Sequence, residues 1–198
     1  MQKDVGARIL DATLEVVARE KISGTRMHLI AKEARMTQSN LHYYFPTKND
    51  LLIALLNRLQ DDFSENRKKV VDLDEKSVAQ NIRAIFAEKK EMTLHNRKLD
   101  YLQFDYWVQG TVDLKVRDTF QRTFEVWRRD IQTVLVHGKT DAASDSIARM
   151  TPYLMVSLMM GASMQYLMDE GSFDLDEYFT MAEQMVVGLL EVEEKREV

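Results

Sequence analysis

The 198-residue chain contains no cysteine, which excludes disulfide bonds and thiolate metal ligands. It also has only 2 prolines and 7 glycines, the residues that most often interrupt regular structure. Its amino terminus has no cationic segment followed by an apolar core, so we expect no secretory signal peptide there. The few prolines and glycines favour long helices, and the lack of cysteine and of a signal segment favours a location in the cytoplasm.

Hydrophobic residues make up 45% of the chain, an ordinary share for a globular protein. Along most of the sequence they repeat at the i, i+3, i+4, i+7 spacing of amphipathic helices. We therefore predict an all-α fold. The expected helices cover about 3–21, 27–34, 37–45, 48–69, 77–93, 97–109, 116–136, 145–168 and 174–192.

Residues 26–52 predict a helix-turn-helix. Two short helices, each with an apolar face, are separated by a tight connection, and Thr37 supplies a hydroxyl that suits the N-cap of the second. Leu41 and Phe45 are expected in the core, and Gly24 in a left-handed conformation after the first helix of the chain. The outer face of the second short helix is polar and carries no acidic residue, which suits the major groove of DNA.

The candidate DNA contacts follow from this placement. Amide and hydroxyl side chains from 38 to 40 are the expected base readers, and Lys48 is expected to bind a phosphate. The full set is Thr25, Arg26, His28, Thr37, Gln38, Ser39, Asn40, His42, Tyr43 and Lys48.

The same stretch resembles the DNA-binding motif of the tetracycline-repressor family of bacterial regulators. The resemblance covers roughly the first quarter of the chain and is carried by Gly24-Thr25, Ile30-Ala31, Ala34, Leu41-His42-Tyr43-Tyr44-Phe45, Lys48 and Leu51-Leu52. It implies a three-helix DNA-binding head at residues 1–47, joined by a long helix to a helical-bundle ligand and dimerisation domain at 48–198. Two positions depart from the family pattern: Arg35 replaces a turn glycine, and His42 replaces a tyrosine.

The net charge of −5 is divided unevenly along the chain. Residues 1–50 contain eight Lys and Arg against six Asp and Glu, so 8 − 6 = +2, and the remainder carries −5 − 2 = −7. This sign difference fits an amino-terminal domain that faces DNA and an acidic remainder that stays away from the duplex.

No charged residue occurs between 150 and 168. That length could span a bilayer, but the run includes Thr151, Pro152, Ser157 and Gln165 and has no flanking basic clusters. We interpret it instead as a helix buried between its own core and a second subunit. Paired with the last helix, it predicts a homodimer through about 145–168 and 174–192.

A small-molecule effector site is expected among aromatic and methionine side chains of the carboxy-terminal domain. Asp105 is either a charged member of that site or a solvated surface residue. The candidate set is Tyr101, Phe104, Asp105, Trp107, Phe124, Met155 and Met159. The chemical identity of the effector does not follow from these residues.

No catalytic, metal or cofactor motif was found. Glu91 and His95 are four residues apart, whereas a di-iron bundle needs repeated pairs at a spacing of three. The segment 161–165 lacks the closing glycine of a nucleophile elbow. We therefore expect no enzyme, no metal and no cofactor.

These observations predict a homodimeric transcriptional regulator that binds a palindromic operator on double-stranded DNA, with repression released by an effector. Two alternatives stay open: an all-α ligand carrier or enzyme with a vestigial DNA-binding head, and an adaptor that uses the helix-turn-helix to bind another protein.

Overall fold

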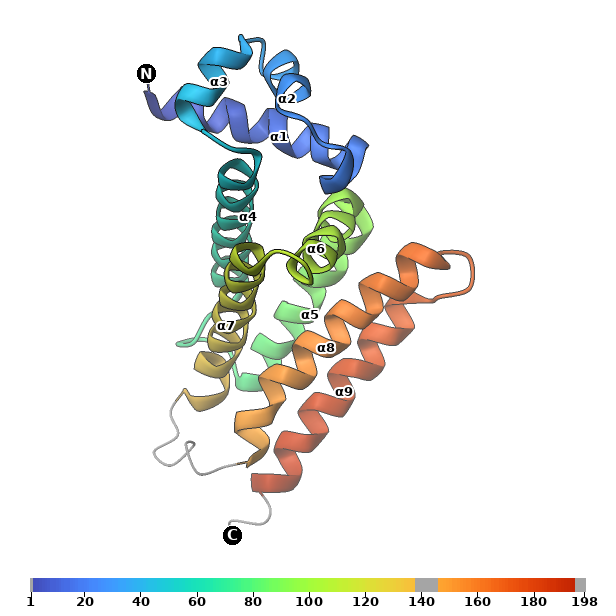
Figure 1. Cartoon of the computed structure of the whole chain (residues 1–198). Helices are drawn as coiled ribbons and strands as arrows, with labels where there is room; N and C mark the ends of the chain where they lie inside the picture. Colours follow the sequence, from blue (N-terminus) through green and yellow to red (C-terminus); the bar gives the residue numbers. More distant parts are fainter. Residues whose placement is uncertain (1, 138–145, 195–198) are drawn as a thin grey trace. The chain divides into compact units, whose positions relative to one another are not determined.

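The computed structural model describes residues 2–137 and 146–194. In these two ranges every regular element is an α-helix, which confirms the predicted all-α class (Figure 1). The helices are α1 (Gln2–Gly24), α2 (Met27–Glu33), α3 (Gln38–Tyr44), α4 (Lys48–Val70), α5 (Val78–His95), α6 (Arg97–Gly110), α7 (Leu114–Val136), α8 (Ser146–Met168) and α9 (Leu175–Glu194).

The observed helix bounds lie within a few residues of the predicted ones. Local signals explain several of them: Ser77 and Gln80 form a reciprocal capping box at the start of α5, and Asp50 accepts hydrogen bonds from Thr47 ahead of α4. Position 145, the predicted start of the eighth helix, lies outside the described residues.

The chain forms two compact units. The first unit comprises Met1–Asp62 and Lys98–Thr123, and the second comprises Phe63–Arg97 and Phe124–Val198. Helices α4 and α7 each pass from one unit into the other without interruption. The predicted division at residue 47 concerned function, and it stays a prediction.

In the first unit, α1 to α4 bury a small apolar core. Its fully buried members include Ile9, Ile30, Leu41 and Leu51. Helix α6 is held to α4 in the same unit, because the Tyr106 hydroxyl donates to the Leu52 carbonyl at 2.6 Å. The recognition helix predicted from the sequence therefore has Leu41 in the core, as expected.

In the second unit, the core is formed by α5, α7, α8 and α9. Phe86, Trp127, Met155 and Phe179 are buried there, and Thr93 and Ser163 form a buried hydroxyl pair at 3.0 Å. No helix among the described residues has the length and apolarity needed to cross a membrane.

The connection between α2 and α3 is a Schellman motif. The Met36 N–H donates to the Ala31 carbonyl at 2.9 Å, and the Arg35 N–H donates to the Lys32 carbonyl at 3.1 Å. Arg35 has φ 53, so the left-handed turn forms even though arginine occupies the glycine position.

The left-handed residue near the end of α1 is Lys21, with φ 60 and ψ 167. The expectation of a left-handed Gly24 was therefore wrong, because the change of direction occurs three residues earlier and Gly24 has no positive φ. This backbone region is almost exclusive to glycine, so long-range contacts must hold Lys21 in it.

The turn geometry predicts a stability difference between two substitutions of Arg35. Both Arg35→Gly and Arg35→Ala remove the side chain, but only alanine keeps the Cβ that disfavours a positive φ. We expect the glycine variant to be more stable by about 1 kcal/mol, measured by urea unfolding followed by circular dichroism. An alanine variant as stable as the glycine variant would contradict the left-handed assignment.

Candidate nucleic-acid interface

Helix α3 is fixed at its start and along its inner face. The Thr37 side chain accepts a hydrogen bond from the Asn40 N–H at 3.2 Å, as expected for an N-cap. Leu41 is fully buried, and Tyr44 and Phe45 pack partly buried against the same core. These contacts leave the opposite face of α3 to solvent.

The exposed face of α3 carries the predicted base readers. All of the side chains expected there are exposed, and Tyr43 retains 75% of its exposure. They are Gln38, Ser39, Asn40, His42 and Tyr43. No acidic residue lies in α3, so nothing on this helix repels phosphate.

Hydrogen bonds that link Gln38, His42 and the Pro46 carbonyl fix the side chains on part of this face. Gln38 Nε2 lies 3.3 Å from His42 Nε2, and His42 Nδ1 lies 3.0 Å from the Pro46 carbonyl. A neutral imidazole with its proton on Nδ1 satisfies both contacts, since Nδ1 then donates and Nε2 accepts from the amide. Because the amide N–H donates to His42, the carbonyl oxygen of Gln38 and its second N–H remain for a base edge.

Two of the predicted DNA contacts point elsewhere. Thr25 is fully buried, and its hydroxyl donates to the Lys21 carbonyl at 2.7 Å. The Lys48 ammonium donates to the carbonyls of Ile22 and Thr25 at 3.0 and 3.3 Å. We therefore do not retain Thr25 and Lys48 as side-chain contacts to DNA, because either contact would first require these bonds to break.

The other predicted contacts of this region are accessible. His28 lies exposed in the first turn of α2, and Thr37 is exposed ahead of α3. Arg26 is exposed as well, with one guanidinium nitrogen donating to the carbonyls of Ser23 and Thr25. Sequence reasoning missed two further exposed cations, Lys32 in the last turn of α2 and Arg35 in the turn that follows it.

Both main-chain polar groups of Ile22 are hydrogen-bonded to side chains within the first unit. Its N–H donates to Asp105 Oδ2 of α6 at 2.5 Å, while its carbonyl accepts from Lys48 of α4. Burial lowers the pKa of Lys48, the charge of Arg26 lowers it further, and Asp105 opposes both effects. Asp105 was expected either in a ligand site or in solvent, and it is instead a structural acceptor.

Two more contacts join the same face of α6 to α1. Lys98 forms an ion pair with Glu15 at 2.7 Å, and the Lys21 ammonium lies 5.3 Å from the centre of the Tyr101 ring. Lys98, Tyr101 and Asp105 are spaced three and four residues apart, so they share one helix face. This face holds the strained end of α1 in place.

The tentative ligand residues are divided between the two units. Tyr101, Phe104, Asp105 and Trp107 belong to the first unit, where Trp107 is 57% exposed. The remaining three belong to the second unit, where Met155 and Met159 are fully buried and Phe124 is partly buried against the same hydrophobic core. No group of three or more potential metal ligands occurs among the described residues.

The comparisons with known proteins agree with this geometry. Residues 9–55, which run from α1 into α4, match the family model described as "Bacterial regulatory proteins, tetR family". The nicotine-responsive transcriptional repressor HdnoR of Paenarthrobacter nicotinovorans is 22% identical over 165 residues, 82% of this chain and 83% of that protein. The regulator RutR of Escherichia coli K12 is 42% identical over 53 residues, only 27% of this chain and 25% of RutR.

Among solved structures, the transcriptional regulator FadR from Bacillus subtilis in complex with stearoyl-CoA is similar throughout. The TM-score is 0.77 at 18% sequence identity, with 91% of this chain and 97% of FadR covered. At this identity the likeness concerns the fold.

An all-α chain whose second short helix presents a polar, acid-free face from a helix-turn-helix is a DNA-binding transcriptional regulator. Its residues 9–55 match the DNA-binding domain of the tetR family of bacterial regulatory proteins.

The hydrogen bond between Asp105 and Ile22 predicts how substitutions of Asp105 change the free energy of unfolding. Asp105→Ala removes a charged acceptor from a main-chain N–H and should lower the free energy of unfolding by about 2 kcal/mol. Asp105→Asn should lose about half of that, because the amide oxygen still accepts. Amide hydrogen exchange at Ile22 should accelerate in the order Asp, Asn, Ala.

The control is Asp118→Ala, which removes an exposed carboxylate of the same unit. It should leave both the unfolding free energy and the exchange at Ile22 unchanged. Equal effects of Asp105→Ala and Asp118→Ala would refute the role assigned to Asp105.

Proposed function

We propose that this protein is a homodimeric repressor that binds a palindromic operator and releases it when a small molecule binds. The observation that carries the proposal is the exposed, hydrogen-bonding and acid-free face of α3 in a helix-turn-helix. Such a regulator works where bacterial DNA is, in the cytoplasm.

In the proposed complex α3 enters the major groove. Gln38 and Asn40 contact base edges, since amides bind adenine in bidentate fashion. Arg26, Lys32 and Arg35 neutralise phosphates beside the groove. The remaining exposed polar side chains at the motif complete the interface, namely His28, Thr37, Ser39, His42 and Tyr43.

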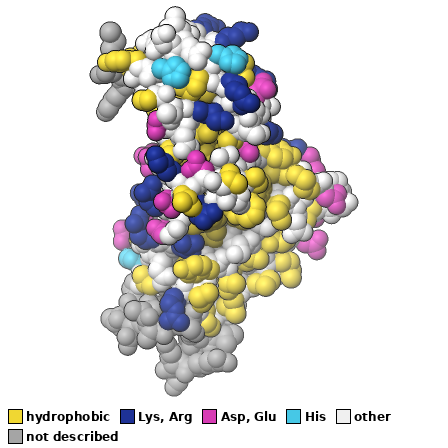
Figure 2. All heavy atoms as spheres, viewed as in Figure 1, with side chains coloured by type: hydrophobic (Ala, Val, Ile, Leu, Met, Phe, Trp, Pro, Cys, Tyr) yellow, Lys and Arg dark blue, Asp and Glu magenta, His cyan; other side chains and the backbone are white. Residues whose placement is uncertain are grey.

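The proposed dimer forms through α8 and α9, which pack against each other in the second unit. Large apolar side chains remain exposed on both helices, as Figure 2 shows over that region. They are Met150, Tyr153, Leu154, Met164, Met168, Met181, Met185 and Leu189. Monomeric proteins rarely leave so large a contiguous apolar surface in water, and a two-fold pair of α8 and α9 covers it as a four-helix interface.

The proposed mechanism is a population shift. Two recognition helices of a dimer must lie about 34–36 Å apart to occupy successive major grooves. An effector that binds more tightly to a conformation with another spacing shifts the population away from DNA. Helix α4 supplies the connection, because it runs from Lys48 beside the DNA-binding helices to Val70 in the second unit.

A ligand carrier or enzyme with a vestigial DNA-binding motif is the second candidate. The absence of acidic residues from the outer face of α3 disfavours it, because a surface released from DNA binding has no reason to exclude them.

Selection of bound sequences from a random DNA pool tests the operator. We expect a palindrome with half-sites about one helical turn apart, and an affinity that falls steeply with salt, by about 0.9 in logarithmic slope per neutralised phosphate. Gln38→Ala should cost roughly 1–3 kcal/mol and relax one base position. Asn57→Ala, an exposed amide of α4, is the matched control and should change neither quantity.

Substitution of the apolar face tests the dimer. The double variant Met164→Glu/Met185→Glu places charges in the proposed interface and should yield monomers in sedimentation experiments. Val112→Glu/Leu114→Glu introduces the same two charges at residues that are 78% and 67% exposed in the first unit, and it should remain dimeric. A monomeric wild-type protein would eliminate the two-fold operator model.

A further inference from the structure

A cavity of about 270 Å³ lies within the second unit, between the end of α4, helix α5 and helix α7. Water occupies about 30 Å³ per molecule in the liquid, so this volume suits a molecule on the order of ten non-hydrogen atoms. None of the residues that line it was among the ligand candidates predicted from the sequence.

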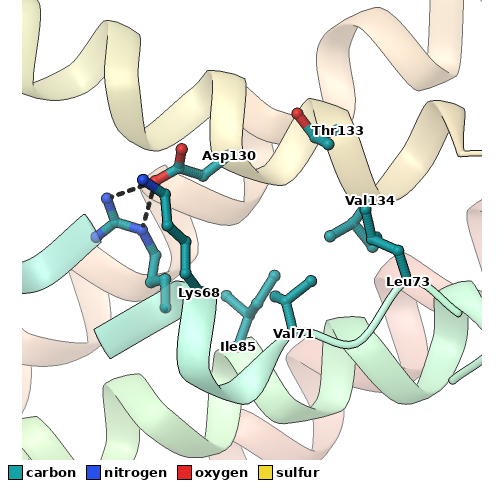
Figure 3. A pocket seen from close by; sticks show the side chains of 8 residues that line it. Lys68, Val71, Leu73, Ile85, Asp130, Thr133 and Val134 are labelled. Carbon is teal, nitrogen blue, oxygen red and sulfur yellow. Dashed lines mark hydrogen bonds and ion pairs between the residues drawn. The ribbon is translucent and has the colours of Figure 1, made fainter. Parts of the chain in front are cut away.

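The lining has two chemically different ends. Val71, Leu73, Ile85 and Val134 supply aliphatic walls. Figure 3 shows Leu73 and Val134 at one end and Lys68 with Asp130 at the other. An occupant that matches this lining has an apolar body and one polar end.

The polar end is dominated by a buried ion pair. Arg67 donates from Nε and Nη2 to Asp130 Oδ2 at 3.3 and 3.0 Å, and Ser64 donates to the same oxygen at 3.0 Å. Burial lowers the pKa of the Arg67 guanidinium, and the charges of Asp130 and Glu88 oppose that effect. All three bonds end on one oxygen of Asp130, and the Arg67 guanidinium already neutralises this carboxylate, which weakens its attraction for a cationic ligand.

The charge balance favours an anion. Arg67 and Lys68 carry two positive charges against the one negative charge of Asp130 among the lining residues. The Lys68 side chain is exposed at the edge of the cavity, where its ammonium can move to a ligand. A carboxylate that binds Lys68 therefore gains a cationic partner without disturbing the Arg67–Asp130 pair.

We propose that this cavity binds a small monocarboxylate with an apolar chain of about eight carbons, held by Lys68 beside the Arg67–Asp130 pair. Resting on the proposed function, this molecule is the effector. Arg67 and Lys68 belong to α4, so the ligand acts directly on the helix that begins at Lys48.

Intrinsic fluorescence measures the binding. The chain has two tryptophans, and Trp107→Phe leaves only Trp127, whose ring lies 5.5 Å from the Arg67 guanidinium carbon. The probes are butanoate, hexanoate, octanoate and dodecanoate, with octanol and octylamine as matched neutral and cationic compounds. We expect affinity to rise about fourfold for each added methylene up to octanoate and to level off or fall for dodecanoate, with octanol weaker and octylamine weakest.

Two adjacent lysines provide the control for charge. Lys68→Glu and Lys69→Glu change the net charge equally, and both side chains are exposed, but only Lys68 lines the cavity. We expect about a tenfold loss of octanoate affinity for Lys68→Glu and little change for Lys69→Glu. Octanol binding should be the same in both variants.

A larger side chain tests the position of the apolar part. Leu73→Trp should weaken octanoate and octanol alike, because it fills the cavity from the segment between α4 and α5. Tighter binding of octylamine than of octanoate, no octanoate binding, or equal effects of the two lysine variants would each overturn the proposal.

The regulatory part has a separate measurement. Saturating octanoate should weaken the complex with the selected operator by about tenfold or more. Unchanged operator affinity with bound octanoate would overturn the effector role while leaving DNA binding intact. If the proposed function itself were wrong, the protein would not bind an operator even in the absence of octanoate, so the two failures can be distinguished.

Discussion

The main chain at Lys21 and Ile22 is the point on which the amino-terminal unit depends. Lys21 adopts a backbone conformation that costs a residue with a side chain on the order of 1–3 kcal/mol, so surrounding contacts must fix it. Asp105 holds the Ile22 N–H, Lys48 holds its carbonyl, and the Tyr101 ring faces the Lys21 ammonium. Three helices, α1, α4 and α6, therefore meet at one main-chain position immediately ahead of the helix-turn-helix. Because α4 and α6 both bond to Ile22, a displacement of either helix relative to α1 would alter these contacts.

On the proposed DNA-binding surface, some residues fix the position of α3 and others remain exposed for contact with bases. Leu41, the Thr37 cap and the Schellman motif at Arg35 fix α3, while Gln38 is oriented through His42 and the Pro46 carbonyl. An oriented amide loses less side-chain entropy on binding than a free one. The net charge of the chain is −5, which opposes non-specific attraction to phosphate. In the proposed complex the base-reading side chains therefore supply a large part of the preference for an operator.

Local patterns predicted the all-α fold, the helix bounds and the exposed face of α3, because helical periodicity and capping depend on residues a few positions apart. The side-chain partners of Asp105, Lys48, Arg67 and Asp130 could not be predicted in this way. Asp105 and Ile22 are 83 residues apart in sequence, and Arg67 and Asp130 are 63 apart. From the sequence, Asp105 was interpreted as either a member of a ligand site or a solvated surface residue. Both interpretations missed that a charged side chain can be satisfied by a distant element, which only the tertiary structure specifies.

The fold does not determine the effector. The relatives are named for a response to nicotine and for a complex with stearoyl-CoA, two molecules with little chemistry in common, on chains only 22% and 18% identical to this one. Ligand selection in such a fold belongs to the few side chains that line the cavity. Here those side chains include a buried ion pair on α4 and α7 that is already complete, with Ser64 as a third donor to Asp130. A ligand that broke this pair would leave a charge buried without a partner, at a cost of several kcal/mol. The cavity therefore selects for molecules that leave the pair intact and use the exposed Lys68, and this requirement separates a carboxylate from an amine of the same size.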